Sequence, residues 1–449
     1  MVVTDLVLLL ILAVVLGALV GILPGLSPLL GLILTLPLVS WAPVWAILIF
    51  WTCYLTVTQY YGSVSAILFK VPGETSSLPV LGASSSITGT RAIVRSLQVT
   101  AFSSLLASMV GIIGLALVIL FLEDSWNNLF RTNISVIFLS ILTVLIISRQ
   151  GAWLRNSALI GLGLFVSNVG SMSFFNSLCG QSQWTCFTLN PTDIGLAIIC
   201  MYVVPYLFFN TDYFDGRQYQ PGKNSSWYTA LRFWPVASKH AILGWFMGFV
   251  PGMGVTLSSN TSAAIETGNK PRRLRIMSAA ESANNSSVIS CTIPFLFVGL
   301  PITSTELLLD NWLLINKAAN VNAGMLYEWV SIYGVVSWPM WSVMLTCLAF
   351  TSIICFYLTS RFVPIYLSIS QVPGHLFGWG IKLSVVLFIW LFIANSDLTP
   401  GSTLFTMIFF TAIGIWSQRR GYDVVALPIA MAIGSFAIDK FSLAFQLWS

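Results

Sequence analysis

Pro-Gly pairs interrupt long apolar stretches of this chain, and the interruptions fall at matching places in its two halves. The first half carries Pro24-Gly25 and Pro72-Gly73, and the second half carries Pro251-Gly252 and Pro301. The prolines lie 48 residues apart in the first half and 50 in the second. Proline removes an amide donor and glycine permits a turn, so each break frees backbone groups inside a helix. Helices broken at corresponding positions of two halves are typical of transporter binding sites.

The composition requires a membrane protein. Of the 449 residues, 57% are hydrophobic and 8% are charged, whereas soluble domains contain roughly 25% charged residues. Apolar stretches of membrane-spanning length recur along the chain, with Val99–Leu122 and Val136–Ser148 as two separate examples. We therefore predict an all-α integral membrane protein with roughly 10–12 transmembrane helices, in two repeated halves with broken helices or re-entrant hairpins.

The polar stretch 210–234 is the one plausible boundary, so we predict three parts. Residues 1–209 form the first membrane repeat, 210–234 a cytoplasmic linker, and 235–449 a second repeat with extra helices. The sequence leaves open whether the repeats are inverted or parallel.

Basic residues between the apolar stretches orient the chain. Four groups are expected on the cytoplasmic side by the positive-inside rule: Arg149 with Arg155, the basic residues from Arg217 to Lys239, those from Lys270 to Arg275, and Arg419 with Arg420. The loop 171–191 has no Lys or Arg and is expected to face outward. This distribution of basic residues requires the segment 241–269 to enter and leave the membrane at the same face, as a hairpin does.

Several function classes are excluded by what the sequence lacks. The seven cysteines are scattered without a C-x-x-C motif, so we expect no metal site and no cofactor. Cys179 and Cys186 share the outward loop, where they either pair or, the reading we favour, remain free thiols. No nucleophile–base grouping and no Walker motif is visible, so we expect neither an enzyme nor an ATP-driven pump. The net charge of +5 does not indicate nucleic-acid binding.

The breaks and the polar residues near them predict the solute site. Freed amides at a half-helix N-terminus attract an anion, and freed carbonyls hold a cation. An alternative is that the small polar residues only join helices to one another. The candidate solute-binding residues are Pro24, Gly25, Ser27, Ser63, Ser65, Pro72, Gly73, Pro251, Gly252, Gly254, Thr256, Asn284, Asn285 and Ser286.

Few charges lie near these segments. Glu281 and Asn284 share a helical face and are candidates for binding a coupling ion, Na⁺ or H⁺. Glu281 alternatively pairs with Arg275 at the membrane surface. Lys70 either pairs with Glu74 or meets an anionic solute. Other ionisable groups are expected to be structural or near the surface: His240, His375, Glu306 and Asp310.

The order and spacing of these motifs resemble one transporter family. Five pieces carry the likeness: Gly17-x3-Gly21-x2-Pro24-Gly25-Leu26-Ser27-Pro28, the run from Tyr61 to Gly73, Gly248-x2-Pro251-Gly252-x-Gly254, Glu281-x2-Asn284-Asn285, and Gly421-Tyr422 with Pro428 and Gly434. Together they are similar to the large membrane subunit of the tripartite tricarboxylate transporters.

This resemblance implies ion-gradient-coupled uptake of a di- or tricarboxylate across a bacterial-type cytoplasmic membrane. It also implies three kinds of partner besides the solute: a periplasmic solute-binding protein, a small four-helix membrane subunit and membrane lipid. The alternative is a diverged channel-like or scaffold subunit without coupled transport. This chain departs from the family pattern where Lys70 replaces an uncharged residue and where Ile302 follows Pro301 in place of glycine.

Overall fold

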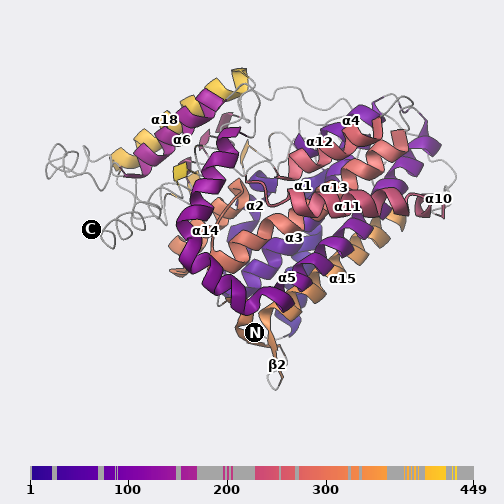
Figure 1. The fold of residues 1–449 in the computed structure, drawn as a ribbon, viewed down its shortest axis with the longest axis horizontal. Helices are drawn as coiled ribbons and strands as arrows, with labels where there is room; N and C mark the ends of the chain where they lie inside the picture. The colour runs from indigo at the N-terminus through magenta and orange to yellow at the C-terminus, as the bar shows by residue number, and fades with distance from the viewer. Residues whose placement is uncertain are drawn as a thin grey trace.

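The computed structural model describes residues 3–22, 28–68, 75–147 except 86 and 88, 153–168, 228–251, 254–267, 273–321, 325–332, 336–361 and 400–420, with isolated positions between 196 and 205, 379 and 393, and 427 and 431. The first-half helices are α1 (Val3–Ile22), α2 (Pro28–Thr35), α3 (Val44–Leu68), α4 (Leu78–Ser84), α5 (Thr90–Ile147) and α6 (Trp153–Asn168), with short 3-10 helices η1 (Leu36–Val39) and η2 (Thr75–Ser77). Figure 1 shows their arrangement.

The later helices are α10 (Tyr228–Leu231), α11 (Trp234–Met247), α12 (Gly254–Thr267), α13 (Arg273–Val298), α14 (Ser304–Lys317), the 3-10 helix η5 (Met325–Tyr327), α15 (Met340–Arg361) and α18 (Pro400–Arg420). A small antiparallel hairpin of β1 (Trp329–Ser331) and β2 (Ser337–Pro339) precedes α15, with Val330 opposite Trp338. The described residues are thus mostly helical, and among them this hairpin is the departure from the predicted all-α chain.

Helices α1 and α2 form a hairpin around the first Pro-Gly break. Gly31 of α2 lies against the side chain of Val20 on α1, so the chain folds back after α1. Helix α1 runs parallel to α3, because Gly17 faces Tyr54 and Gly21 faces Thr58 further along both helices. The break at 23–27 itself lies outside the described residues.

Helices α11 and α12 form a second hairpin around Pro251. His240 of α11 and Glu266 of α12 bond to each other at 3.0 Å, so the open ends of the hairpin meet. This is the hairpin that the charge distribution predicted over residues 241–269. Helix α11 runs parallel to α13, since Gly244 faces Ala283 and Gly248 faces Ser287.

Helix α3 runs in the opposite direction to α13. Trp51, early in α3, packs edge-on against Phe295 near the end of α13, with ring centroids 5.4 Å apart. Tyr60, later in α3, donates to the carbonyl of Ala101 on α5, and neighbouring Ser103 pairs with Ser278 near the start of α13. The two hairpins therefore point in opposite directions.

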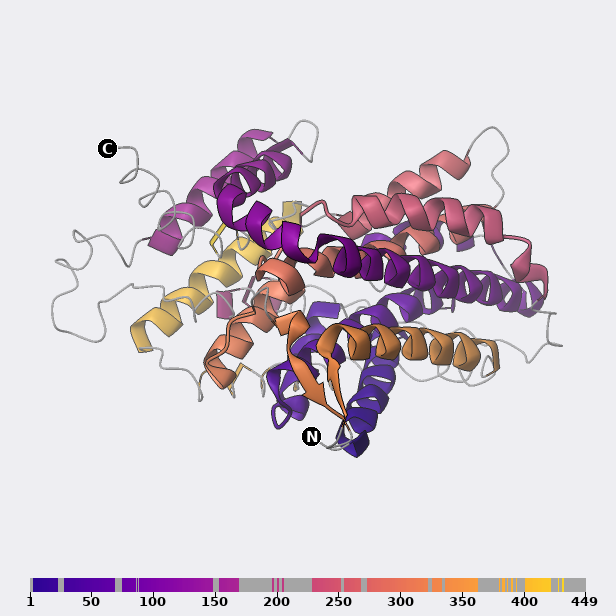
Figure 2. The same cartoon turned by 60° about the horizontal axis from the view of Figure 1, so that its bottom comes forward.

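Helix α5 is continuous over 58 residues, so no loop separates the apolar stretches Val99–Leu122 and Val136–Ser148, and their assignment as two spans stays a prediction. No glycine or proline occurs between Gly114 and Gly151, and the polar residues between the two apolar stretches do not by themselves stop a helix. Figure 2 shows α5 crossing much of the molecule, and it packs against α11, α13 and α15.

Within the described residues, three helices are long and apolar enough to cross a membrane: Val3–Ile22, Thr90–Phe121 and Met340–Arg361. Two shorter apolar helices lie at Ser157–Val166 and Thr403–Trp416. Membrane-length helices agree with the predicted fold class, and the number of 10–12 spans stays a prediction.

Candidate functional site

A buried carboxylate lies between α5 and α13. Glu281 is 1% exposed, and its Oε1 accepts hydrogen bonds from the Ser104 hydroxyl at 2.9 Å and the Asn285 amide at 2.9 Å. The same amide lies 3.1 Å from the Ser104 hydroxyl and 3.0 Å from the carbonyl of Glu281. One helical turn earlier, Ser103 and Ser278 pair at 2.7 Å. Charge-assisted hydrogen bonds are stronger than neutral ones, so this arrangement favours a fixed orientation of the carboxylate.

Several side-chain oxygen atoms of α5 and of the same segment of α13 are buried without a partner. The side-chain carbonyls of Asn284 and Asn285 and the hydroxyls of Ser286 and Ser108 make no hydrogen bond within the part of the chain that the structure describes. Ser108 lies one helical turn after Ser104, on the same face of α5. An unsatisfied buried polar group costs about 1–3 kcal/mol, so a cluster of them indicates groups kept for a ligand or water.

The hairpin α11–α12 brings its own polar groups to α13. The hydroxyl of Ser258 lies 3.0 Å from that of Ser287 and 3.3 Å from the carbonyl of Ala283. All of these groups are buried. The returning arm of the hairpin is thus bonded to the segment of α13 that carries Asn284, Asn285 and Ser286.

One hydrogen bond joins the second hairpin to the first half. Ser259 of α12 donates to the carbonyl of Ser76 in η2 at 2.6 Å. Ser259 follows the break at Pro251, and Ser76 follows the break at Pro72-Gly73. The two segments that follow breaks in different halves are therefore in direct contact.

The other predicted solute residues divide into three groups. Pro251 and Gly254 are buried at the tip of the second hairpin, where a methyl group on Gly254 would lie 2.6 Å from the Met247 carbonyl. Ser63 and Ser65 are buried on α3, with Ser63 bonded to the Tyr60 carbonyl at 3.3 Å, and Thr256 is partly exposed. Outside the described residues lie Pro24, Gly25, Ser27, Pro72, Gly73 and Gly252, and so do Lys70, Glu74, Cys179, Cys186 and His375.

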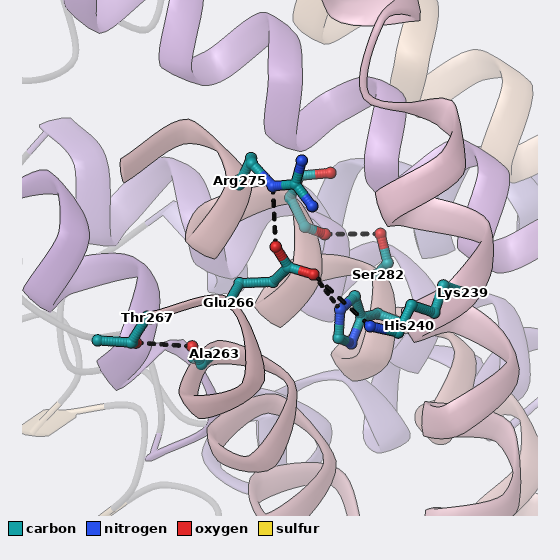
Figure 3. Close-up of polar contacts among 8 residues, drawn as sticks. Lys239, His240, Ala263, Glu266, Thr267, Arg275 and Ser282 are labelled. Carbon is teal, nitrogen blue, oxygen red and sulfur yellow. Dashed lines mark hydrogen bonds and ion pairs between the residues drawn. The ribbon is translucent and has the colours of Figure 1, made fainter. Parts of the chain in front are cut away.

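The predicted alternative pairing of Glu281 with Arg275 is wrong. Arg275 donates to Glu266 of α12 at 2.8 Å, as Figure 3 shows. Glu266 also bonds His240 at 3.0 Å and lies 3.8 Å from Lys239. The α11–α12 hairpin brings Glu266 to the start of α13. Arg275, in the first turn of α13, therefore bonds Glu266 rather than Glu281. His240 is buried in this pairing, which is the structural role expected of it.

Glu306 is not near the surface, contrary to the expectation from sequence. It is 0% exposed, and its Oε2 accepts from the amides of Ile302 at 2.6 Å and Thr303 at 2.9 Å. The turn before it falls at Gly299, where φ is +70°, a conformation that glycine adopts without strain. The chain thus turns at Gly299, two residues before Pro301, although Ile302 stands where the family pattern has glycine.

Sequence reasoning missed Ser104, which bonds Glu281, and the buried Ser108 one turn further along α5. A signal was present, because two serines one helical turn apart in an apolar span mark one polar stripe. The arrangement offers carboxylate, amide and hydroxyl oxygens, which are the ligands that hard cations prefer.

The chain matches the model of a protein family described as "Tripartite tricarboxylate transporter TctA family" over residues 7–429. No curated protein and no solved structure matches the chain.

Proposed function

The chain belongs to the tripartite tricarboxylate transporter TctA family, and from this premise we propose that it couples import of a small organic anion to an ion gradient. Members are the membrane component of a tripartite transport system and are not enzymes. The proposed solute carries one or more carboxylates, and the family's di- and tricarboxylates are the first to test. A periplasmic solute-binding protein and a small membrane subunit are the proposed partners.

We propose that the two halves are inverted repeats. Each half has a hairpin around a Pro-Gly break, followed by a long helix parallel to its first arm. In each hairpin, two glycines four residues apart let the first arm approach that helix closely, as small-residue pairs do between membrane helices. These glycines are Gly17 and Gly21 in the first half, and Gly244 and Gly248 in the second. The opposite directions of α3 and α13 support inversion, since the repeated units then point opposite ways.

The observation that carries the proposal is the bond between Ser259 and Ser76. It places the returning arm of the second hairpin against the segment after the first-half break. The reciprocal contact is also present. Helix α2 is the returning arm of the first hairpin, and it packs against α14, which follows the second-half break. This reciprocal packing supports a solute site enclosed by all four breaks, as in transporters built from repeats.

The residues divide into two proposed roles. Backbone amides and hydroxyls around the hairpin tips bind the solute carboxylate, with Asn284, Asn285 and Ser286 contributing from α13. Glu281 and Asn284, with Ser104 beside them, bind the coupling ion, Na⁺ or H⁺. A carboxylate in a membrane interior marks an ion pathway by default, because an isolated charge there is costly.

The test is uptake of a radiolabelled carboxylate by proteoliposomes with an imposed Na⁺ or H⁺ gradient. Accumulation above the external concentration is expected only with the gradient. Replacing Asn284 and Asn285 together by Ala should abolish it, whereas Asn260→Ala, an exposed site on α12, serves as the control. Flux that follows the solute gradient alone would instead support the channel-like alternative.

A further inference from the structure

The start of α5 carries two exposed arginines on a face that is otherwise apolar. Arg91 and Arg95 lie one helical turn apart, and both are exposed. Further along α5 the face of Arg95 presents Ile113 and Leu120, which are 60% and 61% exposed. The segment Thr90–Phe121 is long and apolar enough to cross a membrane. Exposed apolar side chains on such a helix face lipid, so the two arginines lie where the span reaches the phospholipid headgroups.

The turn between α10 and α11 shows the same order of groups. Arg232 in this turn is exposed, and Trp234, the first residue of α11, is 59% exposed. Ile242 and Phe246 follow on α11 and are 53% and 65% exposed. Tryptophan favours the boundary between headgroups and hydrocarbon. Arg232 is therefore also expected at the level of the headgroups.

Helix packing brings these two segments together. Helix α10 contacts α5, and Trp245 of α11 lies against Gly114 of α5. Both α11 and α5 run parallel to α13, so α10, which precedes α11, contacts α5 toward its start. Arg232 thus joins Arg91 and Arg95 at one corner of the described fold.

This corner is basic and has no acidic partner among the described residues. Neither 75–121 nor 228–251 contains Asp or Glu, and none of the three arginines makes an ion pair within the part of the chain that the structure describes. Glu266 of α12 is bonded to Arg275 and His240 instead. Positive charges held together repel one another unless an anion lies among them. A phosphate is well suited to this place, because guanidinium groups form paired hydrogen bonds with phosphate oxygens.

We propose that Arg91, Arg95 and Arg232 bind the phosphate of an anionic phospholipid, whose acyl chains lie along the exposed apolar faces of α5 and α11. Basic groups between helix ends are typical sites for such headgroups. The bound lipid joins the first arm of the second hairpin to α5. A role in orienting the chain needs only the number of basic residues on one side of the membrane and no defined site. The lipid site does not depend on the transport function proposed above.

The test is thermal unfolding of the purified protein in an uncharged detergent, titrated with phosphatidylglycerol or phosphatidylcholine. Phosphatidylglycerol should raise the melting temperature in a saturable way, because a ligand of the folded state stabilises it. Phosphatidylcholine, whose headgroup has no net charge, should raise it much less, and added salt should reduce the difference. Inorganic phosphate is the third arm of the titration. A shift as large as that with phosphatidylglycerol would contradict a lipid site.

Substitution by glutamine locates the site. Arg95→Gln and Arg232→Gln should each weaken the apparent affinity for phosphatidylglycerol about fivefold, the effect of one basic residue near an anionic surface. Arg420→Gln is the matched control, since it removes one exposed arginine from the end of α18, far from α10 in Figure 1, and should leave the affinity unchanged. Equal responses of the wild type, Arg232→Gln and Arg420→Gln to phosphatidylglycerol would overturn the proposal.

The double variant distinguishes one shared site from a diffuse positive charge. Arg95→Gln combined with Arg232→Gln should lose less affinity than the product of the two single losses, because both residues contact one phosphate. A loss equal to that product would mean that the two charges act independently, and it would contradict a single site between α5 and α10.

Discussion

Ser104 on α5 donates a 2.9 Å hydrogen bond to Glu281 on α13, across 177 positions of the sequence. The bond depends on α5 and α13 running parallel, as the neighbouring contacts of Ser103 with Ser278 and Gly111 with Ile289 require. It fixes the carboxylate between two helices rather than on one. Any movement of α5 against α13 therefore changes the surroundings of this carboxylate. If Glu281 binds the coupling ion as proposed, this contact links ion binding to conformational change.

This bond predicts how ion coupling responds to substitution. Ser104→Ala should raise the cation concentration for half-maximal uptake about tenfold, because removing one partner of a buried charge-assisted hydrogen bond costs about 1–3 kcal/mol. Glu281→Gln should abolish dependence on the gradient altogether. The measurement is initial uptake rate by proteoliposomes against cation concentration. Ser103→Ala, which loses the adjacent hydroxyl pair, is the matched control, and an equal effect there would argue against a specific role for Ser104.

The close approach of the second hairpin to α13 gives a stability prediction. A methyl group at Gly248 would lie 2.5 Å from the Ser287 carbonyl and would also meet the Ser290 hydroxyl. Gly248→Ala should therefore destabilise the protein by about 1–3 kcal/mol, the usual cost of overpacking. Thermal unfolding in detergent measures this. Gly62→Ala is the control, since a methyl group there meets nothing within 4 Å and alanine favours a helix. Equal melting temperatures of the two variants would contradict the close packing of Gly248 against α13.

The sequence predicts the parts of this site that depend on local chemistry. A proline followed by a glycine in an apolar run favours a break in the helix, so the hairpin around Pro251 could be expected. The basic residues on both sides of it indicated that the chain returns to one face. The adjacent amides of Asn284 and Asn285 were recognisable because such polar groups are costly in a membrane.

Partners across the fold could not be predicted in the same way. Spacing on one helix left Arg275 as a candidate partner for Glu281, but tertiary packing delivers Glu266 from α12 instead. The burial of Glu306 likewise depends on how α14 packs against α2, which no local pattern encodes. These contacts depend on the direction, register and crossing angle of helices packed against one another. Hydrophobic periodicity in the sequence indicates that a helix exists but not which helix it packs against.

The cluster around Glu266 predicts the stability of the hairpin's open end. Glu266→Gln removes the charge that holds Arg275 and contacts His240 and Lys239, so α11 and α12 should separate more readily from α13. Faster amide hydrogen exchange at the ends of α11 and α12 is the expected readout. Lys239→Ala should change little, because that side chain is 60% exposed and surface ion pairs are weak. Unchanged exchange in Glu266→Gln would mean that the cluster does not hold the hairpin.

The orientation of the chain predicts which positions face the cytoplasm. The bond between His240 and Glu266 brings both ends of the α11–α12 hairpin together, so the basic residues on either side of it share one face. The positive-inside rule predicts that this face is cytoplasmic. Cysteines at Lys223 and Arg273 should therefore resist an impermeant thiol reagent in intact cells, whereas a cysteine at Ser182 in the predicted outward loop should react.

The native thiols set the background for this labelling. Within the described residues, Cys53, Cys200, Cys291, Cys347 and Cys355 are buried, so they should react slowly. Cys179 and Cys186 lie in the predicted outward loop and must first be replaced by serine. Labelling in permeabilised cells is the control that each introduced cysteine reacts once the reagent can reach it. Labelling at Lys223 and Arg273 in intact cells would invert the orientation, and labelling at only one of them would contradict the shared face of the hairpin.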